Sequence, residues 1–502
     1  MPAHGLNPEN VWKHFGEIAR IPRGSKNEAA AAAHVLQTAA RLGLKASQDK
    51  AGNVVVRKPA SPGREGRRSL CLQSHLDMVC VKEPGKQHDF LKDAIEIVLS
   101  GDYLTANGTT LGADNGIGVA LALAALEDKS LEHGPIECLF TIDEESGMTG
   151  AMNLQPDFLQ SRTLLNLDSE EEGILYVGSA GGTDTVGRWT LATETAPPGL
   201  VAVEIRVKGL SGGHSGVEIH KGRANALKLM TRLLRRLDEL GARLSSLEGG
   251  SARNVIPSTS AARIWIPEGK VQEASRAVDS LRATFQAEGA AADPDLEVHF
   301  DLLRGESRAD SRAGSGAGSG ADSGTQDARV LASSLQHAIL RTLTAMPTGV
   351  NKMSLEIPGL VETSTNLAVA RTTAEALTVE TSQRSSVASE ISEMAACVRS
   401  IFELGGAAVQ SGTGYPAWKP NLSSEIMAVA KAAHLAVTGK EQEVKSMHAG
   451  LECGLIGERV PGMDMVSLGP ELAEVHTPRE RVLIPSVERF CQLLPAILAG
   501  VR

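Results

Sequence analysis

The sequence predicts an α/β fold in which a mostly parallel sheet forms one domain and an α+β domain is inserted into it. Three observations predict this arrangement. Strand-like and helix-like segments alternate through the first third of the 502 residues, paired strands with returning helices fill the middle, and the α/β alternation resumes after about residue 412. Such alternation is typical of a parallel sheet covered by helices. We therefore expect residues 1–186 and 412–502 to form the split domain, and residues 187–411 to form the insertion.

Apolar spacing places the elements of the split domain in order. Apolar residues at helical intervals predict a helix at about 10–20, and further helices are expected at about 27–43 and 117–128. Short apolar runs that end in polar residues predict buried strands, namely "NVVVRK", "SLCLQSHLDMV", "IECLFTID" and "TLLNLDS". After the insertion, the expected elements are a helix at 423–439, the strand "MDMVSLG" and a terminal helix from about 485.

The insertion contains two sets of paired strands and helices, which we interpret as two related halves although no residue-level repeat connects them. In the first set, strands are expected at 200–210, 261–267 and 296–303, with helices at 224–240 and 271–286. In the second set, strands are expected near 350, 365 and 376, with a helix at 386–404. Between the sets, residues near 305–327 are mostly Gly, Ser, Ala and Asp, so we expect a disordered linker there.

Composition excludes several classes of protein. The net charge of -10 disfavours a nucleic-acid partner, and aromatic residues at 3% argue against stacking platforms for single strands. The sequence has no apolar run of about 18 residues and no signal-peptide pattern near residue 1, so we expect a cytoplasmic protein without a membrane span. Its six cysteines form no C-x-x-C pair, which predicts neither a zinc ribbon nor a disulfide framework.

Polar side chains follow several of the expected strands. His75 and Asp77 are two residues apart, so they would leave the same face of an extended chain; taken alone, an ordinary His–Asp contact is the favoured interpretation. Ligand groups of a parallel sheet gather at the carboxyl ends of its strands. We therefore expect His75, Glu144, Glu145 and Asp168, which follow such strands, to converge. Asp114 and His476 are further candidate ligands.

Each of these positions also has an ordinary structural interpretation. Asp114 could cap a helix, and Glu144 and Glu145 could be solvated acids. Asp168 could be a strand-end turn residue, and His476 a loop histidine beside a proline. Their occurrence together in one chain favours a shared function over separate structural roles.

A set of motifs stands in a fixed order along the chain. They are "LQSHLDMV", "TTLGADNGIGVA", "TIDEESGMTGA", "LLNLDSEEEG", "GLSGGHSGVEIHKGRANA", "HAGLECG" and "SLGPELAEVHTPRERV". In these motifs the chain resembles the M20 metallopeptidases, and within them the aminoacyl-histidine (Xaa-His) dipeptidase branch. The resemblance spans nearly the whole chain except the Gly/Ser segment. Ser74 stands where many relatives are expected to have glycine, which puts no catalytic residue in doubt.

The resemblance implies two zinc ions. His75 and Asp168 would bind one ion, Glu145 and His476 the other, and Asp114 would bridge the two. Four positive charges against three carboxylates leave room for one bridging hydroxide at overall neutrality. Imidazole and carboxylate ligands without thiolate suit a hydrolytic zinc pair, although manganese or cobalt could replace zinc.

The resemblance also implies roles for residues that do not bind metal. Glu144 would be the general base and Asp77 would orient the His75 ring. His214 in "GGHSG" would stabilise the oxyanion, often from the partner subunit, whereas its ordinary interpretation is a Gly-rich turn histidine. Asn254 and Arg384 are weaker candidates for holding the peptide carbonyl and the C-terminal carboxylate, because isolated Asn and Arg residues usually cap or lie at the surface.

These expectations combine into one function. The split domain would be catalytic, and the insertion would be a lid and dimerisation domain. The protein would be a homodimeric dizinc dipeptidase that hydrolyses unblocked dipeptides, preferably Xaa-His. One alternative is another M20 amidohydrolase, such as an N-acyl amino acid deacylase or a tripeptidase. A catalytically dead metal-binding scaffold is disfavoured, because Glu144 and the full ligand set are present.

Overall fold

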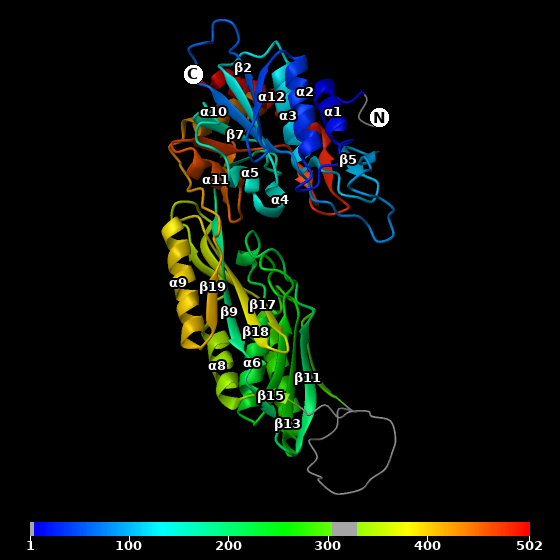
Figure 1. The fold of residues 1–502 in the computed structure, drawn as a ribbon, viewed down its shortest axis with the longest axis vertical. Coiled ribbons are helices and arrows are strands. Elements are labelled where there is room, and N and C mark those ends of the chain that lie inside the picture. Colours follow the sequence, from blue (N-terminus) through cyan, green and yellow to red (C-terminus); the bar gives the residue numbers. More distant parts are fainter. Residues whose placement is uncertain (1–4, 304–328) are drawn as a thin grey trace. The chain divides into compact units, whose positions relative to one another are not determined.

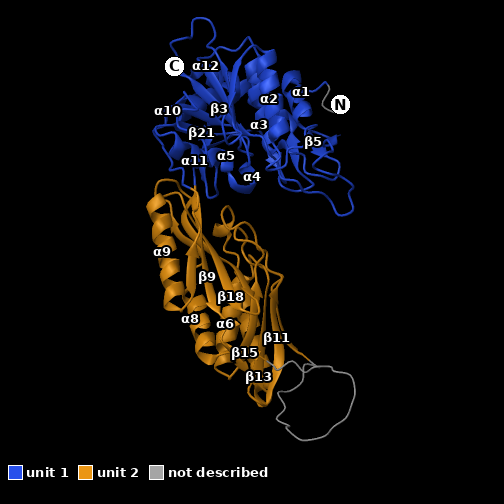
Figure 2. Cartoon of the chain, in the orientation of Figure 1, with its two compact units in different colours: residues 1–179, 416–502 blue, residues 180–415 orange. Residues whose placement is uncertain are grey.

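The computed structural model describes residues 5–303 and 329–502, so the linker expected near 305–327 lies outside the described residues. The chain divides into two compact units, residues 1–179 with 416–502 and residues 180–415 (Figure 2). The insertion therefore begins at Ala180 rather than at 187, and it ends at Tyr415 rather than at 411. The early start has a simple cause: strand β9 (Gly181–Thr190) belongs to the sheet of the insertion, and its polar "GGTDT" start has no strand pattern.

The first unit is built on an eight-stranded sheet in the order β1-β2-β6-β3-β7-β21-β8-β20 (Figure 1). Its strands are β1 (Lys45–Gln48), β2 (Val54–Lys58), β3 (Leu70–His75), β6 (Ile136–Thr141), β7 (Thr163–Asn166), β8 (Ile174–Ser179), β20 (Glu443–Met447) and β21 (Asp464–Ser467). The central strands β6, β3, β7 and β21 run parallel, whereas β1, β2 and β8 each form an antiparallel pair within the sheet. The expected mostly parallel sheet is confirmed.

Helices cover both faces of this sheet. Alternate strand residues point to opposite faces, so Val54 and Val56 enter one apolar core while Val55 enters another. The larger core packs under α1 (Glu9–Ile18), α2 (Ala29–Arg41), α3 (Ala113–Glu127), α10 (Glu425–Thr438) and α12 (Ile484–Gly500). The smaller core packs under α5 (Thr149–Met152) and α11 (Glu452–Arg459). A one-turn helix, α4 (Glu144–Gly147), follows β6.

A four-stranded sheet in the order β22-β23-β5-β4 joins distant parts of the first unit. Its strands are β4 (Ile97–Ser100), β5 (Tyr103–Ala106), β22 (Leu472–Ala473) and β23 (Arg481–Leu483). Antiparallel pairing of β23 with β5 brings the C-terminal segment beside the chain that leads into α3. His476 lies in the β22–β23 connection, and Asp114 lies at the start of α3, which follows β5. Because β23 and β5 are neighbours in one sheet, the two segments are held close together.

The second unit is a nine-stranded antiparallel sheet with all four of its long helices packed into one core. Its first half runs β11 (Leu200–Lys208), α6 (Ala226–Asp238), β12 (Arg243–Gly249), β13 (Ser260–Pro267), α7 (Val271–Gly289) and β14 (Glu297–Leu302). Its second half runs β9, α8 (Ser333–Ala345), β17 (Val361–Thr372), β18 (Ala376–Ser385), α9 (Ala388–Leu404) and β19 (Ala408–Ser411). A ninth strand, β16 (Gly349–Met353), pairs with β17, and a separate ribbon pairs β10 (Thr193–Thr195) with β15 (Arg329–Leu331).

The two halves of this sheet have the same arrangement. The strand order is β14-β11-β13-β12 in the first half and β19-β9-β18-β17 in the second, read towards the junction where β12 meets β17. Counted along the chain, the first strand of each half pairs with the third and the fourth strands of that half. A helix follows the first strand and another follows the third. The topology therefore contains the repeat that the residues alone do not show.

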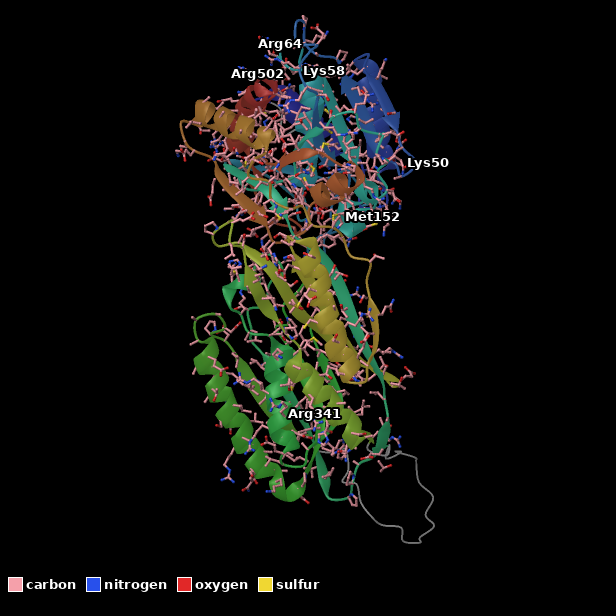
Figure 3. All side chains as sticks on the ribbon, turned by 90° about the vertical axis from the view of Figure 1, so that its left-hand side faces the viewer. Lys50, Lys58, Arg64, Met152, Arg341 and Arg502 are labelled. Carbon is pink, nitrogen blue, oxygen red and sulfur yellow. The ribbon has the colours of Figure 1, made fainter. Side chains whose placement is uncertain are left out.

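Side chains fill both units (Figure 3), with Lys58 at the end of β2 in the first and Arg341 on α8 in the second. Among the described residues, no helix is both long enough and apolar enough to cross a membrane.

Candidate metal centre

Three adjacent parallel strands of the first unit deliver most of the candidate residues. His75 is the last residue of β3, whose neighbours in the sheet are β6 and β7. Glu144 and Glu145 follow β6, and Asp168 follows β7. Because all three strands run in the same direction, their carboxyl ends meet at one edge of the sheet. The expected convergence is found. Asp114 joins it from the start of α3, and His476 joins it from the connection between β22 and β23.

Asp114 lies between the two histidines. Its Oδ1 is 3.1 Å from Nε2 of His75, and its Oδ2 is 3.0 Å from Nε2 of His476. Each oxygen of one carboxylate thus faces a different imidazole. This is the arrangement that a carboxylate bridging two metal ions requires.

The remaining acids divide between the two imidazoles. Asp168 Oδ1 lies 3.2 Å from Nε2 of His75, whereas Glu145 Oε2 lies 3.1 Å from Nε2 of His476. His75, Asp114 and Glu145 place ligand atoms within 4.8 Å of one another, which is the spacing of a group that can hold an ion. The contacts fall into the same two pairs that the resemblance implies.

The electrostatics of this cluster fit divalent cations. Burial chiefly raises the pKa of Glu145 to about 7, while hydrogen bonds to Asp114 and Glu145 raise the pKa of His476 to about 11. Three carboxylates in a largely buried site therefore draw positive charge towards themselves. Oxygen and imidazole donors without thiolate suit zinc, manganese or cobalt, so the residues fit the two ions that the ligand set implies.

Glu144 and Glu145 lie in different environments although they are adjacent in sequence. The turn that carries them begins at Asp143, whose φ of 53° is in the left-handed region. Glu145 contacts His476, whereas burial and the negative charges of Asp168 and Glu452 raise the pKa of Glu144 well above its usual range, with His75 opposing. A raised pKa is typical of a carboxyl group that exchanges protons during catalysis.

Asp77 connects His75 to the turn that carries the two glutamates. His75 Nδ1 donates to its Oδ1 over 3.2 Å, and the backbone amides of Glu144 and Glu145 donate to its two oxygens over 3.0 and 3.1 Å. Ser25 Oγ donates as well, over 2.8 Å. Burial opposes ionisation, but these hydrogen bonds lower the pKa of Asp77 to about 2. With its Nδ1 proton held by a carboxylate, His75 presents Nε2 to the cluster.

Glu480, which sequence reasoning missed, holds the backbone around Asp114. Its carboxylate is 2% exposed and accepts hydrogen bonds from four consecutive amides, those of residues 111–114, over 2.7 to 3.2 Å. The start of α3 is therefore fixed from the same segment that carries His476. The only signal in the sequence is that Glu480 belongs to the motif of His476.

Arg23 is a second residue that the sequence did not reveal. Its buried guanidinium donates to the carbonyl oxygens of Leu76 and Asp77 over 3.0 and 2.7 Å, and to that of Gly112. Gly112 has φ of 70°, and a Cβ there would lie 2.6 Å from Arg23 Nη2. Arg23 thus joins the end of β3 to the start of α3. This close contact requires glycine at position 112.

Glu480→Gln is expected to weaken metal binding. The Glu480 carboxylate accepts from four backbone amides with two oxygens, whereas a glutamine side chain has only one oxygen. The backbone at Asp114 therefore loses part of its support. Loss of such a supporting contact typically costs ~10- to 100-fold in metal affinity or activity. Zinc titration monitored by calorimetry would measure the change. Glu458→Gln, an exposed change on α11, is the control, and equal affinities in both variants would contradict this role.

Two further carboxyl groups near the cluster were also missed. Glu452 is fully buried, and one of its oxygens accepts from Gln73 Nε2 and from Thr141 Oγ1, each over 2.6 Å. Gln73 and Thr141 belong to β3 and β6, so Glu452 links the two strands that deliver His75 and the glutamates. Burial together with the charges of Asp114 and Asp168 raises the pKa of Glu170 to about 8. Both lie inside motifs, "HAGLECG" and "LLNLDSEEEG", which is the only signal for them in the sequence.

Asn254 and Arg384 lie in the inserted unit and line the same cavity, whose volume is about 180 Å³. Arg384 is 9% exposed, and its Nη1 donates to Tyr415 Oη over 2.5 Å, while its Nε has no hydrogen-bond partner among the described residues. Arg253 also lines the cavity, but its guanidinium is paired with Asp184 and Glu380. Arg384 thus places a buried guanidinium at this cavity.

His214 lies beside Asn254 in the inserted unit. The amide of Ser215 donates to the carbonyl oxygen of Asn254 over 2.7 Å, and His214 forms a bridge with Val255. The amides of Gly216 and Val217 both donate to His214 Nδ1 over 3.2 Å. Because Nδ1 accepts, the proton of the neutral ring is on Nε2, which makes His214 a hydrogen-bond donor through that atom.

Comparisons with known proteins show what this chain is similar to. Residues 71–499 match peptidase family M20/M25/M40. The chain is 37% identical over 497 residues to the cytosol non-specific dipeptidase of Escherichia coli (strain K12), covering 99% of this chain and 98% of that protein. The crystal structure of aminoacylhistidine dipeptidase from Vibrio alginolyticus aligns with a TM-score of 0.87 at 38% identity, covering 100% of this chain and 98% of that one.

A more distant structure shares the fold alone. Aminopeptidase PepT from Bacillus cereus ATCC 10987 aligns with a TM-score of 0.56 at 18% identity, covering 99% of each chain. The match over whole chains includes both units.

Proposed function

This chain belongs to peptidase family M20/M25/M40, and we propose that it is a metal-dependent dipeptidase that hydrolyses unblocked dipeptides, preferably those of the Xaa-His type. The full-length similarity to two dipeptidases supports this reaction, and the name of the Vibrio alginolyticus enzyme supports the preference for histidine. The observation that carries the proposal is the position of Asp114 between two imidazoles, each of which also faces a second carboxylate.

The proposed ligands form two sets. His75 and Asp168 would hold one zinc ion, Glu145 and His476 the other, and Asp114 both, with manganese or cobalt as substitutes. Two such ions supply Lewis acidity, which polarises a carbonyl and lowers the pKa of water. Asp77 orients His75. It also accepts hydrogen bonds from the amides of Glu144 and Glu145, which holds the turn that carries these two residues.

Glu144 is the proposed general base. Its carboxylate would take a proton from the attacking water and deliver it to the leaving amine, a task for which the ideal pKa lies near the operating pH. Its neighbour Glu145 contacts His476, which leaves Glu144 free of that role. His214 is proposed to donate from Nε2 to the oxyanion, from its own or from the partner subunit.

Arg384→Met is expected to raise the KM for dipeptides about 10- to 100-fold with little change in kcat, because a charge-assisted hydrogen bond to the substrate carboxylate is lost. Arg384→Lys should recover only part of the loss, since lysine lacks the planar fork. Steady-state kinetics on an Xaa-His dipeptide would measure this. Arg371→Met, an exposed change on β17, is the control. A fall in kcat at constant KM would contradict a binding role.

A substrate panel tests the proposed function itself. The apo protein would be supplied with zinc, manganese or cobalt and assayed on carnosine-like and other Xaa-His dipeptides, tripeptides and N-acetyl amino acids. Preferred hydrolysis of unblocked dipeptides supports the proposal. Preferred hydrolysis of tripeptides or N-acetyl amino acids would instead indicate a different amidohydrolase of the family, and metal binding without turnover would indicate a scaffold.

Assembly and location form part of the proposal. We expect a homodimer in the cytoplasm, in keeping with the name of the Escherichia coli relative for the location and with the expected role of the insertion for the assembly. Light scattering coupled to size-exclusion chromatography would decide the oligomeric state, and a monomer at micromolar concentration would contradict the dimer.

A further inference from the structure

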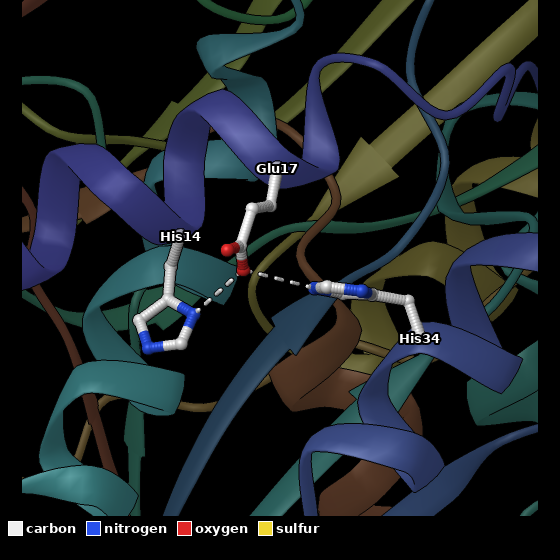
Figure 4. A group of neighbouring side chains, drawn as sticks. All are labelled: His14, Glu17 and His34. Atoms are coloured by element: carbon white, nitrogen blue, oxygen red, sulfur yellow. Dashed lines mark ion pairs between the residues drawn. The ribbon is translucent and has the colours of Figure 1, made fainter.

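Helices α1 and α2 of the first unit bring two histidines and one glutamate together, none of which has been assigned a role above (Figure 4). His14 and Glu17 are one turn apart on α1, and His34 lies on α2. Glu17 Oε2 is 3.6 Å from His14 Nδ1 and 3.8 Å from His34 Nε2. The three ligand atoms all lie within 4.8 Å of one another. We call His14, Glu17 and His34 the helix-pair cluster.

Two ring nitrogens of this cluster have no hydrogen-bond partner among the described residues. They are Nδ1 of the fully buried His14 and the buried Nε2 of His34. Separations of 3.6 and 3.8 Å are too long for hydrogen bonds. They are close to the spacing of ligands around tetrahedral zinc, where bonds of 2.0–2.1 Å place the ligand atoms about 3.3 Å apart.

A carboxylate fixes the orientation of the buried ring. His14 Nε2 donates to Glu127 Oε2 over 2.9 Å, at the end of α3. Histidines that bind metals usually donate their second ring proton to such a carboxylate, which directs the lone pair of the other nitrogen to the ion. Here that lone pair belongs to Nδ1, which faces Glu17 (Figure 4). Burial also lowers the pKa of both His14 and His34, which favours neutral rings able to bind metal.

We propose that His14 Nδ1, Glu17 and His34 Nε2 bind a zinc ion that joins α1 to α2. The two imidazoles and one carboxylate supply three of four tetrahedral positions, and water takes the fourth, because Glu17 is 33% exposed and leaves the cluster open on one side. The cluster is distinct from the candidate metal centre: His14 contacts Glu127 at one end of α3, whereas Asp114 lies at the other end, and the helical stretch 116–127 alone spans about 17 Å at 1.5 Å per residue. The ion stabilises the packing of α1 on α2 and takes no part in hydrolysis.

Metal content tests the proposal directly. The wild-type protein, His34→Gln and Glu17→Gln would be dialysed against zinc buffered at low micromolar free concentration, and zinc per chain would be measured by mass spectrometry. Each variant is expected to hold one ion fewer than the wild type. His299→Gln is the control, since it removes an exposed histidine that also pairs with a glutamate, Glu297, at 2.8 Å. Hydrolytic activity should be the same in all four proteins.

Two results would overturn the proposal. One is equal zinc content in the wild type and both variants, and the other is a wild-type protein that takes up this ion only at millimolar zinc. The two variants are independent, so if His34→Gln does not fold, as judged by circular dichroism, Glu17→Gln still decides. Thermal unfolding gives a second readout, because added zinc should raise the Tm of the wild type more than that of either variant. Failure of the dipeptidase proposal would leave these measurements unchanged, as none depends on turnover.

Discussion

Glu144→Ala is expected to lower kcat by about 10²- to 10⁴-fold while both metal ions stay bound. The reason is that Glu144 is proposed to move a proton between water and the leaving amine, and such transfer contributes a factor of this size. Its neighbour Glu145, not Glu144, contacts His476, so the ligand set stays complete without it.

Parallel measurements of kcat and metal content would check this result. Glu144→Gln keeps the shape of the side chain without the ability to take up a proton, so it should be as inactive as the alanine variant. Glu458→Gln on the exposed face of α11 should retain full activity. Loss of one ion from Glu144→Ala would assign Glu144 as a ligand and contradict its role as base.

His214→Ala is expected to lower kcat by about 10²- to 10³-fold, the usual cost of removing one oxyanion donor. Metal content and KM should stay near the wild-type values, because His214 belongs to the inserted unit and the proposed metal ligands belong to the other. His220→Ala is the matched control: it removes an exposed histidine six residues further along the same segment.

A mixed dimer would show which subunit supplies His214. Chains carrying Glu144→Ala and His214→Ala would be given different tags, co-expressed and purified as the mixed species. If His214 acts across the dimer, one composite site contains both wild-type residues and activity returns, although each homodimer is nearly inactive. No recovery in a metal-loaded mixed dimer would indicate action within one chain, and full activity of His214→Ala alone would remove the residue from the mechanism.

Residues at strand ends could be predicted from the sequence, because local pattern determines them. An apolar run followed by a polar residue identified His75 and Asp168, and the parallel sheet then required their strand ends to meet. Helix α8 was missed despite Ile339, Leu340 and Leu343 at helical spacing, since the serines and threonines around them weaken the pattern.

The supporting contacts could not be predicted, because they join residues far apart in sequence. Glu480 binds amides that precede it by more than 360 positions, and Arg23 binds carbonyls that follow it by more than 50. Neither position has a periodic pattern around it, and a buried carboxylate or guanidinium is recognised only when its partners are known. The same is true of Glu452 and of the helix-pair cluster, whose members come from different elements.

The position of β21 in the first sheet bears on how this protein is made. β21 lies between β7 and β8, yet about 300 residues separate β7 from it in the chain. At ~5–20 residues per second of synthesis, the edge of β7 that pairs with β21 stays unpaired for roughly 15 to 60 s. During that time the nascent chain presents unpaired backbone groups that can join other chains. The nascent chain should therefore depend on a chaperone until β21 has been synthesised and has paired with β7. The finished chain should depend on one far less.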